Sequence, residues 1–355
     1  MTVVRPATLT SIAASAGVSV STVSKVLNGR SDVAPRTRDR VGRMLRQQGY
    51  QVTAMPGTGV VDLLTGHLGS LWADELIRGT VSAAAEANTS VIVSRVTSDD
   101  EFAAWLKAAV ARGTAGALSL LHMPGESMLR RLADERVPLV VIDPPTEPEA
   151  TSVRSVGTTN FQGGMAAARH LIELGHRRIA AIGGPDHLWS CRTRLDGYRS
   201  ALRRAGLAVD EDLVRVGALT AGQGCALAAS LLDMADPPTA IVAANDAQAF
   251  GVLQALAARD LRAPRDLSVT GFDDLPVATW SAPPLTTVRQ PLAAMAASAF
   301  WMLTRTADSG SADAAMRPRH LELETTLVIR DSTAPPGMIS RVPASRRQAL
   351  PAEPA

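Results

Sequence analysis

Hydrophobic residues near the start of the chain recur at helical spacing. Leu9, Ile12, Ala13 and Ala16 stand at i, i+3, i+4 and i+7, which is the pattern of one face of an amphipathic helix. Gly17 follows the last of them, at a position where a left-handed backbone conformation commonly ends a helix. The pattern therefore predicts a short first helix that ends in a tight turn.

A second helix is predicted from its cap Ser19 to about Leu27, and a third over residues 35–49. Val23 and Val26 share the apolar arc of the second helix, so its polar residues occupy the opposite arc. Two helices around a glycine turn, with a supporting third, are typical of a helix-turn-helix that places its second helix in the DNA major groove. Packed helix pairs without a role in nucleic-acid binding are the alternative.

From residue 60 onward, short apolar runs alternate with helical stretches of 10–15 residues. This rhythm is typical of parallel sheets covered on both faces, and it restarts near residues 151–159, which predicts two α/β units. The segment 284–291 then leads into a helix at 292–305, and a last strand follows at 321–330; one more helix and one more strand suit a chain that crosses back between the units. The expected earlier strands lie at 60–64, 91–96, 116–121, 138–143, 178–184, 213–217, 239–245 and 267–274.

The charge of the chain is concentrated at one end. Residues 1–50 hold eight Lys and Arg residues and two acidic residues, whereas the whole chain of 355 residues has 36 basic and 34 acidic residues. A basic segment beside a helix-turn-helix pattern is the electrostatic footprint expected on DNA phosphates. Two cysteines form no metal-binding or disulfide pattern, and no apolar leader or membrane-length run is present, so we expect a cytoplasmic protein.

The head, IAASAGVSVSTVSKVLNGRSDVAPRTRDRV, closely resembles the LacI/GalR family of bacterial transcription regulators. The later phrases HLIELGHRRIAAIGGP, RLDGYRSAL, AIVAANDAQAFGVLQAL, DLSVTGFDD and PPLTTVRQP resemble that family too, so the similarity covers about residues 8–332. The resemblance implies an α/β two-lobed, type I periplasmic-binding-like core of parallel sheets flanked by helices, with a small all-α helix-turn-helix head. The expected parts are a head over 1–50, a linker or hinge over 51–59, a first lobe over 60–158 plus 290–318, a second lobe over 159–289 plus 319–332, and a disordered tail over 333–355.

The resemblance places the base-contacting residues at Val20, Ser21 and Lys25, on the polar arc of the second helix. Lys25 can donate to guanine, Val20 can touch a thymine methyl group, and Ser21 can pair with several bases. Hydroxyl groups beside them suit phosphates, which position a protein without specifying sequence. The remaining predicted DNA-binding residues are Thr8, Ser19, Thr22, Ser24, Asn28 and Arg36.

The linker departs from the family pattern. The family usually carries a hinge helix here, which inserts a leucine into the minor groove and kinks the operator. Only nine residues separate Tyr50 from Val60; they include Pro56 and no leucine, which leaves Met55 as the sizeable apolar candidate. We expect a weakened or absent wedge. The alternative is a brief turn over 53–55 that forms on DNA and lets Met55 act as the wedge.

Polar residues end several predicted core strands. Asp143, Asn245 and Asp273 each follow an apolar run, and the carboxyl ends of parallel strands are where open α/β sheets bind ligands. Carboxylates and amides there suit the hydroxyl groups of a polyol, and Arg194 could donate to the same ring. The family resemblance implies effector contacts at Arg194, Asn245 and Asp273.

Each remaining candidate has a structural alternative. Trp72 could stack on a sugar face or pack in the core, and Asn160 lies where the chain passes between lobes. Asp143 could merely close a turn, while Asp246 and Asp274 could cap the elements that follow them. The sequence leaves both interpretations open for these residues.

We therefore predict a ligand-responsive repressor that binds a near-palindromic, double-stranded DNA operator as a homodimer and is released by a sugar or sugar derivative. The alternative is a repressor that requires a purine-like corepressor. An enzyme is disfavoured because the chain lacks a P-loop, a GxGxxG after its first core strand, an HExxH and a GxSxG. We expect no catalytic residue, no metal, no cofactor and no membrane partner.

Overall fold

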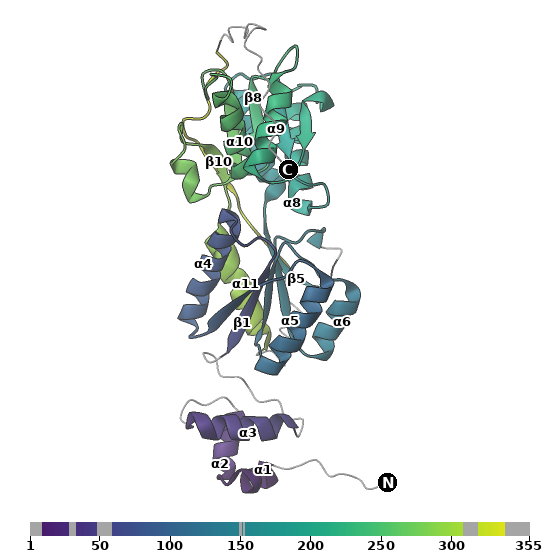
Figure 1. Ribbon diagram of the computed structural model, residues 1–355, viewed down its shortest axis with the longest axis vertical. Coiled ribbons are helices and arrows are strands. Elements are labelled where there is room, and N and C mark those ends of the chain that lie inside the picture. The colour runs from purple at the N-terminus through teal and green to yellow at the C-terminus, as the bar shows by residue number, and fades with distance from the viewer. Residues whose placement is uncertain are drawn as a thin grey trace.

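The computed structural model describes residues 9–27, 33–47, 59–148, 151, 153–307 and 319–337. Within these residues the chain forms a small helical head and two α/β lobes, each built on a six-stranded sheet (Figure 1). The second lobe contains most of the described residues that follow β5 (Arg154–Thr158). Segments of the chain cross between the lobes, so each lobe is assembled from separate stretches of sequence.

The described head consists of α1 (Leu9–Ala16), α2 (Val20–Leu27) and α3 (Pro35–Gln47). Gly17 has a φ of 61°, the left-handed conformation that its place after the first helix predicted. The three helices share one apolar cluster, which is how such short helices are stabilised. Its buried members are Ile12, Ala13, Ala16, Val23, Val26, Val33, Val41 and Leu45.

The first lobe has the strand order β11-β5-β4-β3-β1-β2, with all neighbouring strands parallel. Its elements are β1 (Val60–Thr65), α4 (Leu71–Glu86), β2 (Ser90–Arg95), α5 (Asp99–Arg112), β3 (Gly116–Leu120), α6 (Glu126–Asp134), β4 (Leu139–Ile142), β5 (Arg154–Thr158), α11 (Leu292–Ala307) and β11 (His320–Leu323).

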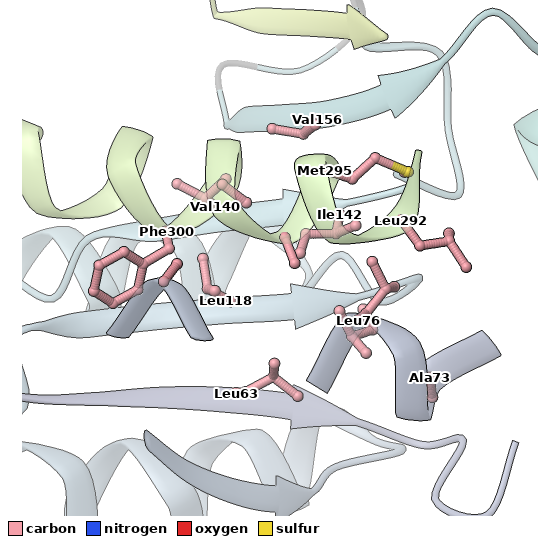
Figure 2. Packing of buried hydrophobic residues seen from close by; sticks show 14 of the residues in the cluster. Leu63, Ala73, Leu76, Leu118, Val140, Ile142, Val156, Leu292, Met295 and Phe300 are labelled. Carbon is pink, nitrogen blue, oxygen red and sulfur yellow. The ribbon is translucent and has the colours of Figure 1, made fainter. Parts of the chain in front are cut away.

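Helices cover both faces of this sheet. Strand residues such as Leu63, Leu118 and Val140 pack under Leu76 of α4 and Phe300 of α11, so a late helix completes the core of an early sheet (Figure 2). On the other face, α5 and α6 pack on residues of β1 and β3 in a separate apolar cluster. The parallel, doubly covered sheet predicted from the continuous apolar runs is confirmed.

The second lobe has the order β12-β10-β9-β8-β6-β7, and β12 is antiparallel to β10. Helices α7 and α8 pack on one face, and α9 and α10 on the other. Its elements are α7 (Asn160–Glu173), β6 (Ile179–Gly183), α8 (Trp189–Arg204), the 3₁₀ turn Glu211–Leu213, β7 (Val214–Val216), α9 (Ala221–Leu232), β8 (Ala240–Ala243), α10 (Asp246–Ala257), β9 (Ser268–Asp273), the 3₁₀ turn Pro276–Thr279, β10 (Thr286–Arg289) and β12 (Thr326–Val328).

The end of the chain corrects two sequence predictions. The single strand expected over 321–330 is two strands in different sheets. Strand β11 pairs with the edge of β5, with His320 opposite Ser155, whereas β12 pairs with β10. The assignment of 319–332 to the second lobe is therefore wrong for β11, which belongs to the first.

The second correction concerns the predicted disordered tail, 333–355. Its first residues pack on the second lobe: the Thr333 hydroxyl lies 2.9 Å from His170 Nε2, and the Ala334 amide donates to Ser268 Oγ at 3.1 Å. The Ala334 carbonyl oxygen lies 2.9 Å from His176 Nε2. The prediction of disorder is wrong for 333–337, and 338–355 lie outside the described residues.

Candidate functional site

Helix α2 begins as the sequence predicts. Ser19 Oγ accepts a hydrogen bond from the backbone N–H of Thr22 at 3.1 Å, which satisfies one of the amides that a helix start leaves unpaired. Val23 and Val26 are buried against the other head helices. This packing fixes which side of α2 faces away from the head.

The outward side carries the predicted base-reading residues. Val20 is 43% exposed, and Ser21 and Lys25 are exposed as well. Ser21 Oγ lies 2.8 Å from Ser19 Oγ, while Thr22 and Ser24 are half-buried. Thr8, Asn28 and Met55, and the side chain of Arg36, lie outside the described residues.

A second polar group lies between the lobes, centred on Arg194 of α8. Its side chain is 7% exposed, and the guanidinium lies 3.8 Å from the centroid of the Phe272 ring. The Nε–H group donates to Asn160 Oδ1 at 2.8 Å, and Nη1 donates to the Ala244 carbonyl at 2.8 Å. Arg194 therefore connects the start of α7, in the crossing segment, to the end of β8.

Asp273 ends β9 beside this arginine. Its Oδ1 lies 3.8 Å from Arg194 Nη1 and accepts a hydrogen bond from Gln290 Nε2 at 2.6 Å. Gln290 Oε1 in turn accepts from the Thr158 hydroxyl at 2.9 Å. This chain of contacts links the second lobe to the last residue of β5 in the first lobe. Asp273 has a φ of 117°, a strained conformation for a residue with a side chain, of the kind often held at functional sites.

Asp143 follows β4 of the first lobe and is 5% exposed. Burial raises the pKa of its carboxyl group, an effect opposed by the charge of Arg194 and a hydrogen bond from Ser190. Burial also raises the pKa of Asp273 to about 7, against the opposing effects of Arg194 and Gln290. Two carboxylates thus share one buried guanidinium, and added hydrogen-bond donors would stabilise their ionised forms.

A cavity of about 210 Å³ adjoins this polar group. Asp143 and Asn160 line it, together with Trp189 and Thr193 of α8 and residues of the edge strand β11. Both lobes contribute to its walls. Two half-buried aromatic residues, Trp189 and Phe161, line this cavity, and neither is among the site residues predicted from the sequence.

Two predicted effector residues have structural roles in the described conformation. Asn245 caps α10, where its Oδ1 accepts from the Gln248 amide at 2.9 Å and its Nδ2 donates to the Leu219 carbonyl at 3.3 Å. Trp72 is 9% exposed and packs in the apolar cluster of the first lobe. The structure thus brings together Asp143, Asn160, Arg194 and Asp273.

The neighbouring acids Asp246 and Asp274 hold the backbone together. Asp246 is fully buried, and its carboxylate accepts from the Thr287 hydroxyl and from the Leu275 amide. Asp274 forms ion pairs with Arg289 and Arg330. Neither is a helix cap: Asn245 occupies that position before α10, and Leu275 occupies it before the 3₁₀ turn Pro276–Thr279.

Metal-binding and membrane-spanning features are both missing from the part of the chain that the structure describes. It contains no group of three or more His, Cys, Asp or Glu side chains arranged to hold a metal ion. Among the helices described, none combines the length and apolarity that crossing a membrane requires. Burial raises the pKa of the Cys191 thiol to about 11, so it is protonated at neutral pH.

Comparisons with known proteins agree with this architecture. A family model described as "Bacterial regulatory proteins, lacI family" matches residues 8–52, and one described as "Periplasmic binding protein-like domain" matches residues 168–333. The HTH-type transcriptional regulator CelR of Thermobifida fusca is 34% identical over 340 residues, which are 92% of this chain and 98% of CelR.

Two solved structures show the same arrangement. The complex of the transcriptional regulator CelR with cellobiose has a TM-score of 0.70 at 33% identity, covering 92% of this chain and 99% of that one. The Lac repressor dimer bound to operator and the anti-inducer ONPF has a TM-score of 0.69 at 25% identity, covering 93% and 100%. The identity to CelR over nearly the whole of both chains shows that this chain belongs to the lacI family of bacterial regulatory proteins and is a DNA-binding regulator of transcription.

Proposed function

We propose that this chain is a cytoplasmic repressor that binds a near-palindromic operator as a homodimer and is released when a sugar enters between its lobes. The buried set Asp143, Asn160, Arg194 and Asp273 carries the proposal. Carboxylates accept hydrogen bonds while a guanidinium and an amide donate them, which suits paired sugar hydroxyl groups. The solved complex of CelR with cellobiose supports a sugar as the class of ligand.

The sugar would act through the lobes that hold it. Hydroxyl groups that donate to Asp273 and Asp143 favour the ionised carboxylates, and ring or hydroxyl oxygens accept from Arg194. Because the binding groups come from both lobes, the ligand stabilises one arrangement of the lobes over others. In a dimer that arrangement sets the separation of the two heads, which couples ligand binding to operator release.

On the DNA side, we propose that Val20, Ser21 and Lys25 read base edges. The exposure of all three on the outward face of α2 supports this assignment. Thr22 and Ser24, beside them, would contact phosphates. The cleft binds its ligand without changing it chemically and uses no cofactor.

A thermal-shift screen with mono- and disaccharides tests the ligand class. A sugar present at a hundred times its Kd should add about 2.7 kcal/mol to the free energy of unfolding. The same sugar should weaken operator binding in a mobility-shift assay, and mass spectrometry of the released ligand should find it unchanged. Stabilisation by purines alone, with tighter operator binding, would contradict the sugar proposal and support a corepressor.

The variant Asp273→Ala tests the site itself. Removing one partner of a buried, charged hydrogen bond costs roughly 2–5 kcal/mol of binding free energy. The variant should bind operator like the wild type and fail to respond to the sugar. Wild-type sugar affinity in calorimetry would exclude Asp273 from the site.

A further inference from the structure

The cavity of about 210 Å³ extends beyond the polar group that the proposed function uses. We call it the lateral chamber; Asp143 and Asn160, which interact with Arg194, line it, and so do His320 and Glu322 of β11. Its volume holds on the order of ten water molecules, so it has room for a ring of sugar size. The chamber lies beside the Arg194–Asp273 contact, and neither of those residues lines it.

The chamber presents a fixed aromatic wall. Trp189 begins α8, and its backbone N–H donates to the Pro145 carbonyl of the other lobe at 2.8 Å. The guanidinium of Arg192 lies 5.4 Å from the centroid of the indole, close enough for a cation–π interaction. The first contact fixes the backbone of Trp189 and the second restrains its ring, so little conformational entropy is lost when a ligand packs on the indole.

Polar groups surround this aromatic wall. Thr193 and Gln162 from the second lobe and His320 from the first line the same space, and the His320 ring is held by a 2.9 Å contact between Nδ1 and Ser155 Oγ. A sugar ring has the matching chemistry, because its C–H faces are apolar and its hydroxyl edge is polar. The carboxyl groups of Asp143 and Glu322 disfavour a phosphate or carboxylate in this chamber.

We propose that the lateral chamber binds the second unit of a neutral disaccharide or glycoside whose first unit contacts Arg194 and Asp273. This proposal rests on the proposed sugar-responsive function and narrows its ligand class. Trp189 is the specificity-determining residue for the second unit. Because Trp189 is tied to Pro145 across the lobes, a ligand that fills the chamber also stabilises the contact between them.

Calorimetry on the full chain tests the chamber. The probes are glucose, galactose and xylose, and α- and β-linked disaccharides of each, including cellobiose. At least one disaccharide should bind tenfold or more tightly than either of its units. Trp189→Ala should abolish this advantage and leave monosaccharide affinity within about threefold. Gln162→Trp, which places a bulky ring at the chamber, should have the same effect without removing the indole.

The control is Trp280→Ala, because Trp280 is 76% exposed and outside the chamber lining. Trp280→Ala should change neither the monosaccharide affinity nor the disaccharide affinity. Equal binding of mono- and disaccharides by the wild type, or a disaccharide advantage that survives both chamber variants, would overturn the chamber assignment alone. A wild-type protein that binds none of these sugars would overturn the chamber and the proposed function together. Asp273→Ala should lose all sugar binding, whereas Trp189→Ala should keep monosaccharide binding. This pair of results would show that the first sugar unit depends on Asp273 and the second on Trp189.

Discussion

Gly164 of α7 lies directly against the backbone carbonyl of Arg194 in α8, and no Cβ fits between the two helices. The two helices are equally close at a second point, where a Cβ on Gly197 of α8 would overlap the backbone carbonyl of Phe161 in α7. These two glycines allow the helices to approach closely enough for Arg194 to reach Asn160. The position of Arg194 therefore depends on glycine, which has no side chain, at both Gly164 and Gly197.

Gly164→Ala should lower the free energy of unfolding by about 1–3 kcal/mol or more, because the helices must separate to admit the methyl group. It should also weaken effector binding, since Arg194 moves with α8. Gly222→Ala is the matched control: Gly222 lies in α9 with no atom within 4 Å of an added Cβ. That variant should be neutral or more stable by up to about 1 kcal/mol. Denaturant unfolding measures both, and equal stability of the two variants would contradict this account of the crossing.

The raised pKa of Asp273 predicts a pH dependence. The carboxyl group has a pKa of about 7 in the folded protein and about 4 when unfolded. The protonated carboxyl group therefore stabilises the folded state fully below a pH of about 4, and this stabilisation is lost as the pH rises through 7. Asp273→Asn keeps an acceptor for Gln290 but cannot ionise. The ligand-free variant should match the wild type in unfolding temperature at pH 4 and exceed it at pH 8.

The same titration affects the effector. If the sugar donates to ionised Asp273, wild-type affinity should fall as the pH drops below about 7, because a proton must first leave the carboxyl group. Calorimetry between roughly pH 5.5 and 8.5, in steps of about half a unit, would reveal the slope. A difference in unfolding temperature between wild type and Asp273→Asn that stays constant with pH would show that this carboxyl group does not titrate in that range.

Base reading by α2 can be tested by selection. Randomising Val20 and Ser21 together should return operators with altered base preferences, each lost base contact costing about 1–3 kcal/mol of binding free energy. Ile12→Ala is unsuitable as a control because Ile12 is buried in the head, whereas Ser11 is exposed on α1. Randomising Ser11 should leave the consensus unchanged. An unchanged consensus for the Val20 and Ser21 library would exclude them from base contact.

The linker prediction concerns residues outside the described ranges. With Pro56 present and no leucine, we expect the operator to be bent only weakly at its centre. Measuring bend angles by phased mobility shift should give similar values for the wild type and Met55→Ala. A strong central bend that is lost in Met55→Ala would show that the short linker still inserts an apolar wedge.

Elements with strong local patterns were predictable, and those defined by distant partners were not. The helix start at Ser19 and the turn at Gly17 follow from capping chemistry within a few residues. By contrast, β5 has the sequence RSVGT, which lacks a continuous apolar run. It is a strand because β4 and β11 pair with its two edges, and β11 lies more than 150 residues later.

The aromatic residues of the candidate site illustrate the same limit. The sequence pattern alone predicts a helix over 194–205 and leaves Trp189 in a loop, whereas α8 begins at Trp189. The pattern likewise predicts a helix over 74–87, whereas α4 begins at Leu71, so Trp72 lies on a helix that packs into the core of the first lobe. A shift of a few residues in a helix start decides whether an aromatic ring faces a cavity or a core. Gln290, which joins Asp273 to Thr158, was present in the phrase PPLTTVRQP but had no chemical signal to distinguish it.

The division of the last strand between two sheets has a consequence for biosynthesis. A nascent chain that has emerged only as far as Thr158 contains β1 to β5, yet it lacks α11 and β11. Its sheet would expose the apolar face that Phe300 and Met295 later cover, and the open edge of β5 would be available to other chains. The first lobe is therefore unable to complete its fold until more than 320 residues have been synthesised. We expect the isolated fragment 59–158 to aggregate and to regain solubility when residues 290–323 are supplied in trans.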